Sequence, residues 1–199
     1  MKGVFDVTFQ SALDVFNYGL VLSYGLFLSV SSAGGCTEKR DRELVALLCP
    51  VFLVLQSLFA LTLGTDKTMQ LYPLIVHLPL VLILTLALKK PLGVAVVSTC
   101  TAYLCCQPLR WGKNAVEALT GSMLAADIAY IVLLVGVFWL CERFLVKAAY
   151  ATMTYSRWTL LLFGSLPVAY YILDYATTVY SDALYYNVLI ISAFLRTVL

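Results

Sequence analysis

Ionisable side chains inside apolar stretches of the sequence are the first candidates for chemistry. Asp14, His77, Asp127 and Asp174 each lie a few residues from one end of a long apolar run. Burying such a group in hydrocarbon costs at least about 2.5–3.5 kcal/mol, so it normally faces a partner or a water-filled cavity. Two arrangements meet this requirement. All four residues share a wet pocket, or they pair between helices, for example Asp127 with His77.

Tyrosines gather at the same ends of these apolar runs. Tyr171, Asp174 and Tyr175 follow helical spacing and therefore share one helix face. Aromatic walls with a few polar groups are typical of a site for a small amphipathic ligand, whereas a belt of Tyr and Trp at a membrane interface is the alternative. The predicted ligand-binding residues are His77, Tyr103, Asp127, Tyr171, Asp174 and Tyr175.

The cysteines raise the question of catalysis. Cys105 or Cys106 with His77 would form a Cys–His dyad, the minimum for an intramembrane cysteine peptidase. The six cysteines and one histidine fit no zinc pattern, and the sequence has neither an HExxH motif nor a glycine-rich phosphate loop. We therefore expect no catalytic residue, no metal site and no cofactor in this chain, and we expect the cysteines to pack as small apolar residues.

The composition indicates which elements position these residues. Hydrophobic residues make up 62% of the 199 and charged residues 12%, whereas soluble domains have about 45–50% apolar and 25% charged residues. The fold class is therefore all-α, a polytopic membrane helical bundle with six complete spans and a truncated seventh. The complete spans are predicted at residues 11–32, 44–64, 71–88, 92–109, 122–141 and 158–179, and the truncated one at 187–199.

The two spans at residues 71–88 and 92–109 form a tight hairpin. Lys89 and Lys90 stay out of hydrocarbon, and Pro91 suits the start of the next helix. Residues equidistant from this turn share a depth, so His77 lies level with Tyr103. The other connectors are predicted as loops at residues 33–43 and 65–70, a polar connector or short interfacial helix at 112–121, and a basic amphipathic segment suited to the membrane surface at 142–157.

Positive residues in the connectors predict the orientation. One side has eight, namely Lys39, Arg40, Arg42, Lys89, Lys90, Arg143, Lys147 and Arg157, and the other has four, namely Lys2, Lys67, Arg110 and Lys113. Because positive loops stay in the cytoplasm, we expect a multi-pass protein of the cell membrane with its N-terminus outside. The last thirteen apolar residues are too few for a span, which needs about 20. Either the last helix is re-entrant or the chain is a fragment of a longer protein, and we expect the fragment.

Several motifs resemble one bacterial family. YPLIVHLPL, KKP and CCQPLRW in the hairpin, and DYATTVYSDALYY from Asp174 to Tyr186, resemble the sensor domain of GHKL-type sensor histidine kinases of the peptide-pheromone-receptor type. The resemblance covers most of the chain from Leu44 onward. It implies that residues 1–199 form a single transmembrane sensor domain, with a cytoplasmic kinase domain after residue 199. It also implies a small extracellular ligand such as a peptide, a homodimer in the full-length protein, and ATP and Mg²⁺ in the kinase domain alone.

The expected function is therefore that of an extracellular-signal sensing module of a two-component system, with an outward-facing ligand pocket. The rival is a small-solute transporter or channel, which needs polar groups that reach both membrane faces, whereas the acidic residues here stop in the outer half. A third interpretation is the cysteine peptidase. Apart from the ligand, we expect the lipid bilayer as a partner and no nucleic acid, because the basic residues lie in short connectors.

Overall fold

The computed structural model describes residues 2–180, and it describes the side chains of residues 16–180 except residues 60, 65 and 66. This part of the chain is helical and has no strand. The predicted truncated span at residues 187–199 lies outside the described residues. The all-α prediction is confirmed for the part that the structure describes.

Five helical segments are long and apolar enough to cross a membrane. They are Lys39–Leu63, Lys67–Ala87, Leu92–Thr120, Met123–Tyr155 and Arg157–Val179. The chain is therefore a multi-pass helical membrane bundle, although the described part holds five such segments where six complete spans were predicted. The predicted first span falls in α1 (Lys2–Ser32), which is 31 residues long but is not among the five.

Several of these segments contain π-helical turns. The segment Lys67–Ala87 lies within α3 (Thr65–Tyr72), η1 (Pro73–His77), α4 (Leu78–Leu82) and η2 (Ile83–Ala87), and η3 (Cys141–Leu145) joins α6 (Met123–Leu140) to α7 (Val146–Tyr155). The remaining elements are α2 (Lys39–Leu63), α5 (Leu92–Thr120), α8 (Arg157–Asp174) and η4 (Tyr175–Val179). Such widened turns are frequent at functional sites, and η1 and η4 both contain predicted site residues.

Three predicted connectors are wrong, because the helices continue through them. Residues 65–70 lie in α3, residues 112–120 lie in α5, and η3 with α7 continues the α6 helix to Tyr155. Polar residues are compatible with a helix and do not end one by themselves. The breaks instead fall where the backbone changes, at Gly64 and Gly121 with φ values of 84° and 64° and at Ser156, which caps α8 with a capping box.

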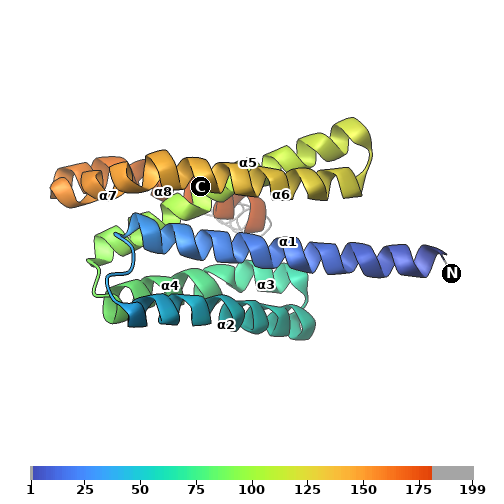
Figure 1. Ribbon diagram of the computed structural model, residues 1–199, viewed down its shortest axis with the longest axis horizontal. Helices are drawn as coiled ribbons and strands as arrows, with labels where there is room; N and C mark the ends of the chain where they lie inside the picture. The colour runs from blue at the N-terminus through green and yellow to red at the C-terminus, as the bar shows by residue number, and fades with distance from the viewer. Residues whose placement is uncertain (1, 181–199) are drawn as a thin grey trace, which may run out of the picture.

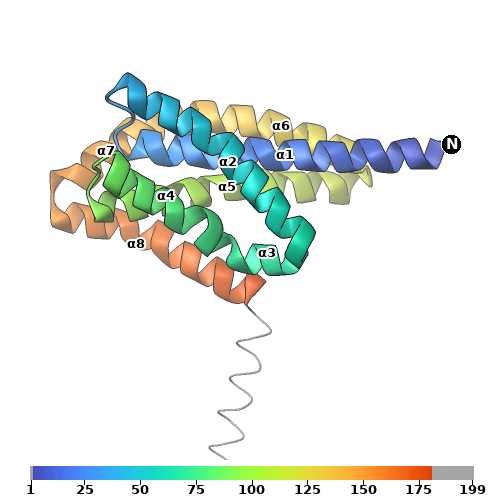
Figure 2. The same cartoon turned by 90° about the horizontal axis from the view of Figure 1, so that it is seen from below.

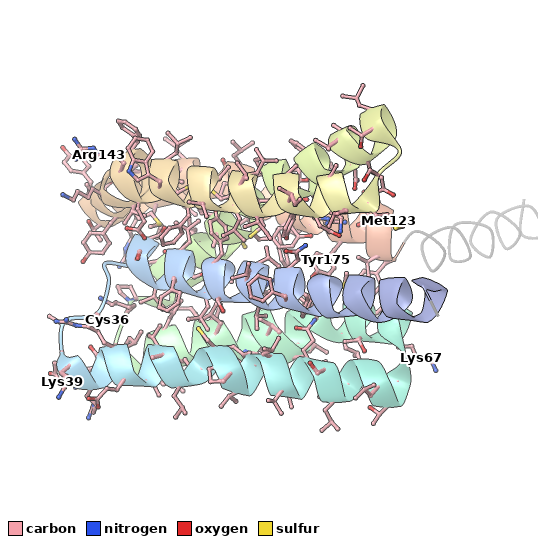
Figure 3. The ribbon with its side chains drawn as sticks, turned by 45° about the vertical axis from the view of Figure 1, so that its right-hand side comes forward. Cys36, Lys39, Lys67, Met123, Arg143 and Tyr175 are labelled. Atoms are coloured by element: carbon pink, nitrogen blue, oxygen red, sulfur yellow. The ribbon has the colours of Figure 1, made fainter. Side chains whose placement is uncertain are left out.

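The predicted hairpin frame agrees with the structure. The turn between η2 and α5 contains Lys89 with a φ of 53° and Pro91 as the residue before α5. In Figure 3, Cys36, Lys39 and Arg143 lie at one end of the bundle, and Lys67 and Met123 lie at the other. The helices run along this common axis (Figure 1), so the two groups of connectors mark opposite ends.

Helix α5 is the centre of the bundle. It packs against α1, α6 and α8, and its apolar stretch is the most buried of the five segments. The outer helices expose large apolar side chains, among them Leu58, Leu82, Val132 and Leu166, which suits a protein whose solvent is lipid. Figure 2 shows that the end of α8 comes close to α3, and this contact closes one side of the site described below.

Candidate functional site

An aromatic cluster surrounds His77 at the end of η1. The ring centroids of Tyr72, Tyr171 and Tyr103 lie 4.8, 5.3 and 5.6 Å from that of His77, and the Tyr175 ring lies 6.4 Å away. The Nδ1 atom of His77 shares a hydrogen bond of 2.7 Å with the hydroxyl of Tyr171. Three elements that are distant in sequence, η1, α5 and the end of α8, therefore meet at one histidine.

Asp174 joins this cluster through Tyr103. The Tyr103 hydroxyl donates a hydrogen bond to Oδ2 of Asp174, and the Tyr180 hydroxyl donates one to the backbone carbonyl of Gln70. Together with the bond between His77 and Tyr171, these contacts tie the end of α8 to η1, α5 and α3. Five of the six predicted site residues thus lie together, namely His77, Tyr103, Tyr171, Asp174 and Tyr175.

Asp127 belongs to a different polar group. Its carboxylate on α6 is fully buried and accepts hydrogen bonds from Nζ of Lys113 at 2.6 Å and from Nδ2 of Asn17 at 3.0 Å. The alternative pairing of Asp127 with His77 is therefore wrong, because His77 bonds to Tyr171 on the α8 side. The side chain of Asp14 lies outside the described ones.

A cavity of about 840 Å³ connects the two polar groups. Its wall includes His77, Tyr103 and Tyr175 from the aromatic cluster, and Asn17 and Lys113 from the group around Asp127. Tyr171, Asp174 and Asp127 do not line it, so they act behind the wall by holding residues that do. Three of the six predicted residues therefore line the cavity. The other three lie behind the wall and bond to residues that line it.

The cavity is polar at one end of the bundle and apolar towards the other. Gln70, Lys113 and Asn114 surround the polar end, whereas Leu22, Leu26, Phe52 and Leu80 surround the interior. Two hydroxyls of the interior are already used within their helices, since Ser29 donates to the carbonyl of Gly25 and Thr99 to that of Ala95. The interior thus offers an apolar surface.

A packed apolar layer lies beneath the cavity. It includes Leu84, Leu88, Val94 and Ala95, all of which are buried in one hydrophobic cluster, and none of residues 81–98 lines the cavity. On the hairpin the cavity therefore ends before the Lys89–Lys90 turn, while on α1 its lining reaches Ser29, one turn before that helix ends. We call Gln70, Lys113 and Asn114 its mouth and this layer its floor.

The Cys–His dyad does not form in this structure. Cys106 lines the cavity with His77, but the hydrogen bond that His77 makes goes to the Tyr171 hydroxyl. The hydroxyl of Tyr24 contacts Sγ of Cys141 at 3.8 Å and the carbonyl oxygen of Cys105 at 3.3 Å. Among the described residues no group of three His, Cys, Asp or Glu side chains could hold a metal ion.

Sequence reasoning missed Asn17, Lys113 and Arg110 as residues of this site. Lys113 and Arg110 were both counted as positive connector residues that indicate orientation, because the predicted span ended at residue 109. One signal was available. Tyr103, Gln107 and Arg110 recur every three or four residues, the spacing of one helix face, and all three line the cavity.

Comparison of the chain with protein-family models, curated proteins and solved structures gives no match.

Proposed function

We propose that this chain is the ligand-sensing membrane module of a sensor histidine kinase. It lies in the cell membrane with its N-terminus and the mouth of the cavity outside. The observation that carries the proposal is the cavity, which is polar and aromatic at its mouth and ends on a packed apolar floor. Its volume falls in the range of about 300–1,000 Å³ that suits small ligands.

The contacts at the end of α8 offer a route for the signal. Tyr175 is part of the cavity wall, and its neighbours Tyr171 and Asp174 bond to His77 and Tyr103. A ligand that displaces the Tyr175 ring would alter these bonds and move α8 relative to α5. In the family that the sequence resembles, the kinase domain follows the sensor domain, so this movement would propagate towards the kinase.

The two rival functions fit the site less well. A transporter or channel needs a polar path to both faces, and the floor interrupts such a path on the Lys89–Lys90 side. A cysteine peptidase needs a thiol within hydrogen-bond reach of its histidine, and His77 bonds to a tyrosine instead. We therefore favour binding and signalling over transport or hydrolysis.

The test measures ATP-dependent autophosphorylation of the full-length gene product in membranes. Asp174→Asn keeps the shape of the side chain but removes the negative charge of the carboxylate that accepts the hydrogen bond from the Tyr103 hydroxyl. We expect it to change autophosphorylation by at least about fivefold, the lower end of typical allosteric coupling, with an unchanged amount of protein in the membrane. Glu43→Gln, an exposed residue at the opposite end, is the control and should have no effect.

Two results would contradict the proposal. A full-length wild-type protein that is not phosphorylated would remove the kinase assignment. If Asp174→Asn lowers phosphorylation only in proportion to the remaining folded protein, the residue supports the helices and takes no part in sensing.

A further inference from the structure

The charged side chains that the structure describes in the cavity wall are all positive. Arg110 and Lys113 line the cavity, and among the described side chains no Asp or Glu does. Both belong to α5 and lie towards the mouth, at the end of the bundle away from Lys89 and Lys90. The wall is therefore cationic at the mouth, aromatic around His77 and apolar at the floor.

The two cations differ in their partners. Lys113 forms an ion pair of 2.6 Å with the buried Asp127, so its charge is balanced within the protein. The contact that Arg110 makes is with the neutral amide oxygen of Gln107, at 3.5 Å, and among the described residues it has no acidic partner at ion-pair distance. Arg110 thus contributes one positive charge that the described part of the wall does not balance.

We infer that the cavity takes an amphiphile with a single carboxylate, which binds the guanidinium of Arg110 while its apolar body fills the aromatic and leucine-lined interior. The inference rests on the proposed function, since it requires the cavity to be a ligand site. A guanidinium presents a planar pair of donors that matches a carboxylate. A single negative charge balances Arg110, whereas a doubly charged phosphate would leave excess negative charge beside Asp174 and Asp127.

The experiment compares two probes with identical apolar bodies. The 199-residue chain is placed in nanodiscs of zwitterionic lipid and titrated calorimetrically with N-octanoyl-phenylalanine or with its neutral amide, and the signal of empty nanodiscs is subtracted. We expect the acid to bind at least about tenfold more tightly than the amide at neutral pH, because charge-assisted hydrogen bonds are the stronger ones.

Variants assign this preference to a residue. Arg110→Gln should bind acid and amide equally, and Arg110→Lys, which keeps the charge but loses the planar fork, should give an intermediate ratio. Arg143→Gln removes an exposed arginine at the opposite end of the bundle and should preserve the wild-type ratio. Arg110 is itself exposed, so these substitutions should leave the thermal unfolding temperature unchanged.

Each other outcome overturns the inference. Equal binding of acid and amide to the wild-type chain would show a ligand cavity without carboxylate recognition, and the proposed function would stand. A preference that persists in Arg110→Gln would place recognition at another residue. Binding of neither probe would refute both the inference and the ligand cavity. If anionic lipid in the nanodiscs abolishes binding of the acid to wild type, the site is occupied by a lipid headgroup and not by a soluble amphiphile.

Discussion

The carboxylate of Asp127 is the clearest case in which one residue depends on its neighbours. It has no exposed surface and bonds to Lys113 and Asn17. A buried carboxylate that loses its cation keeps the full cost of its desolvation. The Lys113–Asp127 pair therefore holds α5 against α6, because the loss of Lys113 would leave the Asp127 carboxylate buried without this counter-charge.

We predict that Lys113→Met lowers the stability of the folded protein by about 3–5 kcal/mol, the usual cost of removing one partner from a buried pair. The measurement is thermal unfolding in detergent. Lys39→Met is the matched control, because the Lys39–Glu43 pair is 3.7 Å long with side chains 90% and 66% exposed, and exposed pairs contribute little. Equal effects of the two substitutions would contradict the role of the Lys113–Asp127 pair.

For single residues, the depth of a side chain along its helix was predictable from the sequence, but the direction in which the side chain points around the helix was not. Counting from the Lys89–Lys90 turn correctly placed His77 and Tyr103 level, and their rings are in contact. Depth alone cannot say which neighbour a side chain faces, so Asp127 was grouped with residues from which it is separate. Its partner Lys113 escaped notice because charged residues after a span are normally interpreted as topology signals.

Close packing between helices depends on single glycines. A Cβ atom on Gly164 of α8 would lie 2.5 Å from Cγ2 of Val97 on α5, and a β-branched side chain in a helix has little freedom to rotate away. A Cβ atom on Gly136 of α6 would meet nothing within 4 Å. The two positions therefore form a matched pair.

We predict that Gly164→Ala destabilises the protein by about 1–3 kcal/mol, as overpacking in a dense interface does. Gly136→Ala should be neutral or slightly stabilising, because alanine favours a helix. Thermal unfolding in detergent distinguishes the two. A stabilising Gly164→Ala would mean that α5 and α8 are less closely packed than the structure has them.

Helix positions were predictable to different degrees. The predicted spans at residues 71–88 and 158–179 correspond closely to the segments Lys67–Ala87 and Arg157–Val179, and the predicted span at residues 92–109 begins where the segment Leu92–Thr120 begins. The ends of α5 and α7 were not predictable from the sequence, because hydrophobicity marks only the part of a helix that lipid surrounds. A helix continues beyond it until the backbone requires a break, as at Gly121 and Ser156.

The two ends of the whole molecule make its orientation testable. We predict that cysteines placed at Lys67 and Met123 react with a membrane-impermeant maleimide added to intact cells, and that cysteines at Lys39 and Arg143 react only after the membrane is opened. The reason is the excess of positive residues at the Lys39 end. The native Cys36 lies at that end and should be replaced by serine to remove its signal.

The reverse pattern, with Lys39 labelled in intact cells and Lys67 protected, would place the mouth of the cavity in the cytoplasm. The module would then respond to a signal from inside the cell, although the residues that form the cavity would be unchanged.

The packed floor beneath the cavity also has an electrical consequence. In the proposed orientation, water that fills the cavity would carry the potential of the outer solution inward, so most of the transmembrane voltage would fall across the packed apolar layer around Leu84 and Val94. A unit charge that crosses the whole field changes in energy by about 2.3 kcal/mol per 100 mV, but a charge beside Arg110 lies above that layer. Occupancy of the cavity by a charged ligand should therefore be nearly independent of the membrane voltage. The proposed sensing module would then respond to the ligand concentration alone, even when the membrane potential of the cell changes.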